Sequence, residues 1–200
     1  MVPQKQWFDS STGDPEQVKR LCLEWKTNPQ VAEILLRRGY KTREEIKSFL
    51  MPNLSNLRDP YELRQMREAV NLLQDTIVNN RRIVILGDYD VDGITATALM
   101  LEFLQKCGNL NLDFFIPNRI KHGYGLTEAS TDILLEMNPE LVITVDNGIT
   151  AAREVKRLND EGIKTIVTDH HLADVSLLPS GIVVNPNHPE CNYPFKKISG

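Results

Sequence analysis

The sequence of 200 residues is poor in cysteine, with Cys22, Cys107 and Cys191 alone. An odd, scattered set of three matches neither a disulfide framework nor the ligand spacing of a zinc site. Because reduced thiols are the rule in the cytoplasm, we expect a cytoplasmic protein in which these side chains mostly pack.

Long apolar runs are also absent. No stretch approaches the roughly 20 residues that a membrane span needs, and the start from Met1 to Trp7 lacks the apolar core of a signal peptide. With 41% hydrophobic and 25% charged residues, the composition excludes a mainly disordered chain. The sequence therefore predicts a globular protein without a membrane segment.

Basic residues are in slight deficit, since the net charge is −4. This balance argues against a large basic surface of the kind that binds nucleic acid through charge. Most of the excess acid lies after residue 81 and includes the aspartates of three motifs described below. If these aspartates hold divalent cations, the acidity is local and neutralised. The net charge then says little about whether the protein binds nucleic acid.

The first 80 residues are predicted to be helical. Asp14 followed by Pro15 is a helix-start signal, and a short second helix is expected over residues 29–38. Thr42 with Glu45 three positions later forms a capping box for a third helix. An irregular connector follows, and then a longer helix with one apolar face. This segment, residues 1–80, is predicted to be a small helical N-terminal region.

The pattern changes at residue 81 to short runs rich in β-branched and aromatic residues. These predicted strands span residues 82–86, 112–116, 141–145, 165–168 and 182–184. Helical stretches fill most of the gaps, at about 94–106, 127–137 and 151–161. Buried strands that alternate with helices indicate an α/β fold with a doubly wound, mostly parallel sheet of five strands. Residues 81–200 are therefore predicted to form one α/β domain.

Polar side chains follow three of the predicted strands, directly where each strand ends. They are Asp88, Asp90 and Asp92 after the first strand, Asp146 after the third, and Asp169, His170 and His171 after the fourth. Ligands of open α/β sheets bind outside the carboxyl ends of the strands. A parallel sheet brings these ends to one edge, so we expect the carboxylates and imidazoles to converge there.

Each of these motifs also has a plainer interpretation. Asp, Asn and Gly after a strand are common turn and N-cap residues, and this alternative stays open for the Asp146-Asn147-Gly148 turn when it is considered by itself. Three carboxylates within residues 88–92 are harder to explain in this way, because they repel unless cations or protons intervene. A calcium-binding EF-hand is excluded, since the twelfth residue from Asp88 is Leu99 where that loop requires Glu.

The mixture of ligand types predicts the chemistry. A lone histidine is more often a satisfied core or surface group, but two adjacent ones behind an aspartate at the tip of a buried strand favour function. Carboxylate and imidazole ligands suit Mn²⁺, Fe²⁺ or Zn²⁺, and an oxygen-rich set favours Mn²⁺ or Mg²⁺. So many carboxylates can hold two ions about 4 Å apart, which would stabilise the attacking and leaving oxygens of a phosphoryl displacement.

The motifs GDYDVDG, VDNG and TDHH, in this order and on these strands, resemble those of the DHH phosphoesterase superfamily. Within it, the sequence is most similar to the RecJ family of single-strand-specific exonucleases. Tyr89 within the first motif, the segment 116–126 and the helical preface support this narrower resemblance.

The resemblance implies roles for individual residues and a cofactor of Mn²⁺ or Mg²⁺, as two ions. The implied metal ligands are Asp88, Asp90, Asp92, Asp146 and His170. It places His171 against the scissile phosphate as a catalytic residue, and Asp169 beside it as the residue that orients its neighbours.

The sequence leaves the roles of other residues in the segments that resemble the family more open than those of the metal ligands. Arg119 and Lys121 are predicted to contact the nucleic-acid backbone, and a solvated basic loop is an open alternative. We expect His122 and His188 not to be ligands. The segment 185–189 also resembles the family, without an assigned role.

The function implied is a metal-dependent 5′→3′ exonuclease on single-stranded DNA, in DNA repair and recombination, with helicases and single-strand-binding proteins as partners. Two alternatives stay open: hydrolysis of small phosphates such as oligonucleotides or cyclic dinucleotides, and a catalytically silent binding module. The family's fourth acidic motif and second domain are not found in the sequence. We therefore expect a truncated catalytic domain that is weakly active or inactive alone.

Overall fold

The computed structural model describes residues 14–196 and residue 198. The chain falls into two compact units, Met1–Arg58 and Asp59–Gly200. Each unit is described by itself.

The first unit is helical, as predicted. Its elements are α1 (Pro15–Trp25), α2 (Pro29–Arg37), α3 (Arg43–Leu50) and the short 3₁₀ helix η1 (Leu54–Asn56). The side chain of Asp14 caps α1 by accepting a hydrogen bond from the amide of Glu16, and the capping box of Thr42 and Glu45 is present at α3. Both expected helix starts are thus confirmed.

The second unit contains the sheet. Its elements are η2 (Pro60–Glu62), α4 (Met66–Val78), β1 (Ile83–Leu86), α5 (Val91–Lys106), β2 (Leu112–Phe115), α6 (Glu128–Met137), β3 (Leu141–Val145), α7 (Ala152–Asp160), β4 (Lys164–Thr168), η3 (Val175–Leu177) and β5 (Ile182–Val184). The strands lie in the order β2-β1-β3-β4-β5, and every pairing is parallel. The predicted five-stranded parallel sheet is confirmed.

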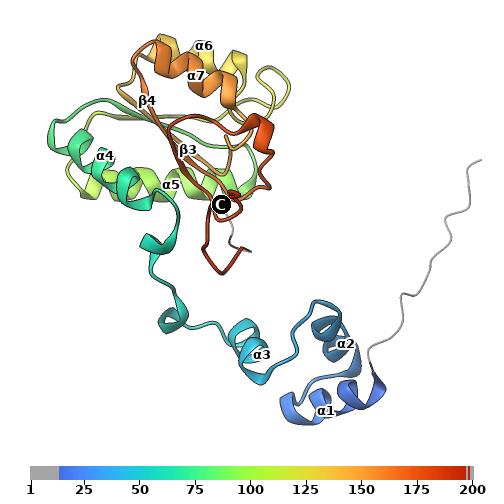
Figure 1. Ribbon diagram of the computed structural model, residues 1–200. Coiled ribbons are helices and arrows are strands. Elements are labelled where there is room, and N and C mark those ends of the chain that lie inside the picture. The colour runs from blue at the N-terminus through green and yellow to red at the C-terminus, as the bar shows by residue number, and fades with distance from the viewer. Residues whose placement is uncertain (1–13, 197, 199–200) are drawn as a thin grey trace, which may run out of the picture. The chain divides into compact units, whose positions relative to one another are not determined.

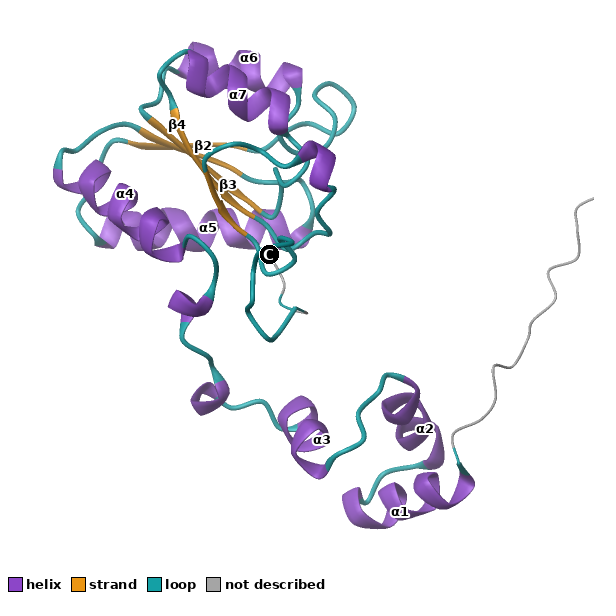
Figure 2. Ribbon diagram, in the orientation of Figure 1, coloured by secondary structure: helices purple, strands orange, loops and turns teal. Residues whose placement is uncertain are grey.

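Helices cover both faces of this sheet, with α4 and α5 on one side and α6 and α7 on the other (Figures 1 and 2). Successive side chains of a strand point to opposite faces. Accordingly Ile83 and Ile85 of β1 pack with the α4 and α5 side, whereas Val84 and Leu86 pack with the α6 and α7 side. The doubly wound arrangement follows from central strands that are buried on both faces, as β1 and β3 are.

Helix α4 belongs with the sheet and not with the helical preface, so the units divide between Arg58 and Asp59 where we had expected residue 80. Its buried Ala69 joins the core on the α5 side. Just before it, Gln65 accepts a hydrogen bond from the amide of Val183 (3.0 Å) and donates one to the carbonyl of Gly181 (3.2 Å). Periodicity identifies the apolar face of a helix, but it does not identify what that face packs against.

The strand order places a topological switch point between β1 and β3 at the carboxyl edge. The connections after these two strands lead to helices on opposite faces of the sheet, so the two loops diverge there. This is the edge to which the sequence assigned the polar motifs. Within the described part of the chain, no helix has the combined length and apolar character that a membrane span requires.

Candidate metal centre

Asp88, the second residue after β1, is fully buried with an exposed fraction of 0%. Within the described residues, neither of its carboxylate oxygens has a hydrogen-bond partner of acceptable geometry. Burial raises the pKa of Asp88, the nearby amide of Tyr89 lowers it in part, and the charge of Asp90 raises it again. A buried carboxylate without a donor is costly unless a cation faces it.

Asp90 caps the N-terminus of helix α5. Its Oδ1 accepts a hydrogen bond from the amide of Gly93 at 3.0 Å, which leaves its other oxygen available. Position 93 must be glycine because a Cβ there would lie 2.5 Å from the backbone nitrogen of Asp88. Asp92, in the first turn of α5, is exposed, and no hydrogen bond or ion pair of the described residues joins it to Asp88 or Asp90.

The turn after β3 presents Asp146, which is 3% exposed and has a φ of +64°. This left-handed conformation is uncommon outside glycine, and such strain clusters at functional sites. The buried amide of Asn147 donates to the carbonyls of Leu86 (3.2 Å) and Val145 (2.9 Å), which ties the ends of β1 and β3 together. Thr144 closes the turn by donating to the carbonyl of Asn147 at 2.8 Å. The turn is therefore more specialised than a plain connection.

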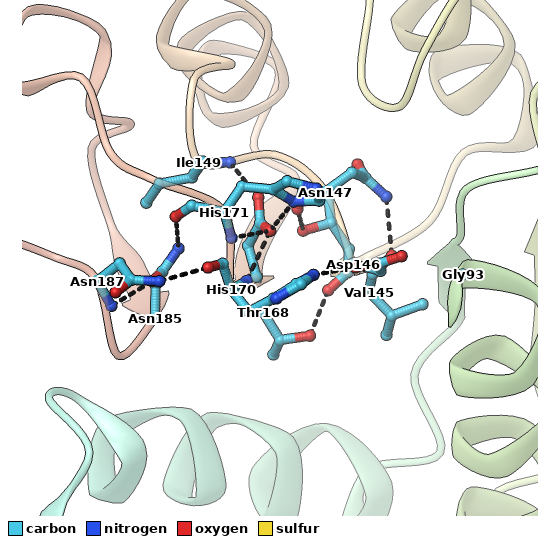
Figure 3. Close-up of polar contacts among 12 residues, drawn as sticks. Gly93, Val145, Asp146, Asn147, Ile149, Thr168, His170, His171, Asn185 and Asn187 are labelled. Atoms are coloured by element: carbon cyan, nitrogen blue, oxygen red, sulfur yellow. Dashed lines mark hydrogen bonds and ion pairs between the residues drawn. The ribbon is translucent and has the colours of Figure 1, made fainter. Parts of the chain in front are cut away.

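The carboxylate of Asp169, after β4, is saturated by hydrogen bonds, and its partners His170, His171 and Ile149 are labelled in Figure 3. Its Oδ1 accepts from the amides of His170 (2.7 Å) and His171 (3.0 Å) and lies 2.7 Å from Nδ1 of His171. Its Oδ2 accepts from the amide of Ile149 at 2.9 Å. With its acceptor sites used in this way, Asp169 fits the orienting role that the resemblance implied, and Nε2 of His171 is left to face the site.

Three side chains form a group able to hold a cation. One ligand atom from each of Asp146, His170 and His171 lies within 4.8 Å of the other two. Nε2 of His170 is 3.0 Å from Oδ1 of Asp146, yet this oxygen has no hydrogen bond of acceptable geometry within the described residues. This nitrogen and this oxygen are close without a hydrogen bond between them, as is expected of two ligands that bind the same cation.

The charges of this site act on one another. Burial raises the pKa of Asp146 and the charge of Asp90 raises it further, while His170 lowers it. Burial lowers the pKa of His171, but its hydrogen bond with Asp169 and the surrounding carboxylates outweigh burial, so the net shift is upward. The site therefore favours added positive charge, as protons or as metal ions.

Of the predicted ligands, the structure gathers Asp88, Asp90, Asp146 and His170 at one edge. It places His171, which we had expected against the phosphate, within the ligand-like group of Asp146 and the two histidines. Among the described residues, Asp88, Asp90 and Asp92 lie outside that group, although the charge of Asp90 acts on Asp146. The assignment of individual ligands stays a prediction.

The predicted non-ligands have other partners. Nδ1 of His122 accepts from the amide of Asn118 at 3.0 Å, and Nδ1 of the buried His188 accepts from the amide of Glu190 at 3.1 Å. Both rings are thus engaged in their own loops.

The two basic residues expected at the nucleic acid are exposed. The guanidinium of Arg119 lies 5.7 Å from the centre of the Tyr89 ring, as a cation–π pair, and Tyr89 contacts Tyr124 edge to face. For Lys121, the structure adds only its place on the same loop, so the solvated alternative stays open.

Sequence reasoning assigned no role to Tyr124. Its hydroxyl lies 3.4 Å from Nε2 of His171 and 3.4 Å from the carbonyl of Asp146. Burial, and then the charge of Asp88, raise the pKa of this phenol, so the hydroxyl stays protonated as a donor. The signal that could have found it is its loop, which follows the carboxyl end of β2.

The sequence has well-matched relatives. A family model described as DHH family, N-terminal domain, matches residues 82–200. The single-stranded-DNA-specific exonuclease RecJ of Bacillus subtilis (strain 168) is 38% identical over 200 residues, which are 100% of this chain and 25% of the relative. RecJ of Thermus thermophilus is 35% identical over 170 residues, which are 85% of this chain and 24% of the relative. The chain thus spans about a quarter of the length of these relatives.

Solved structures of RecJ also match this chain. A crystal structure of exonuclease RecJ bound to manganese matches with a TM-score of 0.61 and 36% identity, covering 67% of this chain and 34% of that one. RecJ from Thermus thermophilus in complex with Mn²⁺ matches with a TM-score of 0.63 and 31% identity, covering 92% of this chain and 25% of that one. With a matching family model over more than half of its length, and the family's motifs at the carboxyl edge of its sheet, the chain belongs to the DHH family.

Proposed function

We propose that this chain holds Mn²⁺ or Mg²⁺ at the carboxyl edge of its sheet, as one part of a two-ion site. The proposed ligands are Asp88, Asp90, Asp146 and His170, with His171 beside them. The observation that carries the proposal is the pair of buried oxygens of Asp88, which have no hydrogen-bond partner of acceptable geometry among the described residues and lie at the same edge as the Asp146 and histidine group. Asp92 stays a predicted metal ligand. RecJ structures that hold Mn²⁺ and Mg²⁺ support this choice of metal.

The proposed reaction is hydrolysis of a phosphodiester bond in single-stranded DNA, as the names of the RecJ relatives indicate. Divalent cations supply charge stabilisation for phosphoryl transfer and an activated water. Asp169 holds Nδ1 of His171, so that Nε2 is directed into the site as a donor to a phosphoryl oxygen. The protonated hydroxyl of Tyr124, 3.4 Å from this nitrogen, supplies a second donor.

Arg119 is proposed to bind the DNA backbone, with Lys121 on the same loop. The cation–π pair with Tyr89 holds the guanidinium beside the first metal motif. One basic loop supplies modest affinity, which agrees with the small charge of the chain.

The wider role rests on the resemblance of the sequence motifs to the RecJ family. We propose 5′→3′ exonuclease action in DNA repair and recombination, with helicases and single-strand-binding proteins as partners, for a protein as long as the RecJ relatives. A cytoplasmic location is proposed because Cys22, Cys107 and Cys191 are all free thiols in the structure.

The test is a calorimetric titration of the chain with Mn²⁺, compared with its Asp146→Asn variant. We expect binding by the wild type and a loss of at least about 10-fold in affinity for the variant, since a ligand is removed. Asp160→Asn, a surface carboxylate paired with Lys156, is the matched control and should bind like the wild type. Absence of Mn²⁺ binding by the wild type would contradict the proposal and favour a silent module.

The substrate is tested with 5′-labelled single strands of increasing length and Mn²⁺. Activity that is maintained on long strands supports the exonuclease. Rates that fall steeply above a few nucleotides would indicate an enzyme whose substrates are small phosphates and not an exonuclease.

A further inference from the structure

The segment after β5 lies against the backbone of the two histidines at the metal site. Nδ2 of Asn185 donates to the carbonyl of His171 at 3.1 Å, and Nδ2 of Asn187 donates to the carbonyl of His170 at 2.5 Å (Figure 3). Asn185 is fully buried. Two adjacent carbonyls thus receive one amide donor each from residues 14 and 17 positions later.

The donors are themselves held in place. Oδ1 of Asn185 accepts from the amide of Asn187 at 2.6 Å, and the carbonyl of Asn185 accepts from the amide of His188 at 3.2 Å. Pro186 restricts the backbone between the two asparagines. Nζ of Lys196 donates to the carbonyl of Pro186 at 2.5 Å, which secures the loop from its far side. The segment is therefore a preorganised donor pair.

Asp169 and the two asparagines together hold the backbone of His170 and His171. The carboxylate of Asp169 accepts from the amides of His170 and His171, and the asparagines donate to the carbonyls of the same two residues. Each histidine is thus fixed at both of its backbone polar groups. Metal ligands must be placed to within a few tenths of an ångström, so this backbone hold determines where the two rings point.

We propose that Asn185 and Asn187 are positioning residues, which hold the backbone of His170 and His171 so that the imidazole of His170 meets the metal and that of His171 faces the phosphate beside it. The inference rests on the proposed metal site and assigns a role to a segment that had none. A loop that merely stabilised the fold would behave differently, because its loss would lower the unfolding temperature without changing the metal affinity of the folded protein.

The test is Asn187→Asp in the same chain. Asparagine and aspartate have nearly the same shape, but the variant replaces the donor to the carbonyl of His170 with an acceptor. Asn187 is only partly buried, which favours folding of the variant. Its added negative charge would by itself attract a cation, so a fall in Mn²⁺ affinity must come from geometry. Asn187→Ala removes the donor without adding charge.

Mn²⁺ affinity is measured by the electron paramagnetic resonance signal of the free ion, below the unfolding temperature of each variant. We expect both variants to bind about 10-fold more weakly than the wild type, as is typical when a group that supports a ligand is lost. Asn53→Asp, an N-cap in the first unit, is the control and should bind as the wild type does. Ring ¹⁵N signals of His170 and His171 should shift in the metal-free Asn187 variants and not in the control.

The outcomes separate the two proposals. If the wild type binds Mn²⁺ and the Asn187 variants bind it equally well, the positioning role is wrong while the metal site stands. If the wild type does not bind Mn²⁺, the metal site fails and the positioning role fails with it. Weaker binding together with shifted histidine signals supports both.

Discussion

Replacing Asp88 with asparagine should stabilise the metal-free protein and abolish its response to Mn²⁺. The side chain is fully buried, its two oxygens lack hydrogen-bond partners of good geometry among the described residues, and the charge of Asp90 lies nearby. Without a cation, the folded state therefore carries a buried negative charge that asparagine would remove with almost no change in shape.

The expected change in the free energy of unfolding follows from these contacts. A buried polar group without a partner costs about 1–3 kcal/mol, and asparagine retains part of that cost because its own amide also lacks a partner. We expect a gain of about 1 kcal/mol in the free energy of unfolding, which raises the unfolding midpoint by about 2–4 °C for a protein of this size. With Mn²⁺ at 100 times its dissociation constant, the free energy of unfolding of the wild type rises by about 2.7 kcal/mol. That of the variant rises little. The order of stability should then reverse.

Thermal unfolding followed by circular dichroism, in EDTA and in Mn²⁺, measures both effects in one series. Asp160→Asn is the control, since an exposed carboxylate in a surface pair should change either midpoint by little. A variant less stable than the wild type in EDTA, or one that gains as much from Mn²⁺, would refute the reasoning. The first result would mean that Asp88 has a structural partner, and the second that it is not a ligand.

Three further predictions test other parts of the molecule. Gly93→Ala should destabilise the second unit by about 1–3 kcal/mol in chemical denaturation, although alanine favours helices, because its Cβ meets the backbone of Asp88. Thr42→Ala should lower the stability of the first unit by about 1 kcal/mol, measured by the helical circular dichroism signal, because the capping box with Glu45 is lost. Arg119→Ala should weaken single-strand binding for all sequences and reduce the slope of affinity against salt by about 1, measured by fluorescence anisotropy.

Much of the fold could be predicted because its strands are short, apolar on both faces and bounded by turn residues. The parallel sheet followed from that pattern, and the shared edge of Asp88, Asp146 and His170 followed from the sheet. The partner of α4 did not, because an apolar stripe identifies a buried face without identifying the surface that buries it. The anchoring of this helix depends on Gln65, a polar residue that no hydrophobic period reveals.

The finer geometry of the site depends on strand register, which the order of motifs along the chain does not contain. Thr168 pairs with Val184, and the amide of Asp169 donates to the carbonyl of Val184, so the two chain segments continue side by side beyond the sheet. This register sets the asparagines of residues 185–187 beside the histidines of residues 169–171. A different register would change these partners while leaving both motifs at the same edge. Strand order thus determines which motifs share the site, and register determines which residues hold the ligands in place.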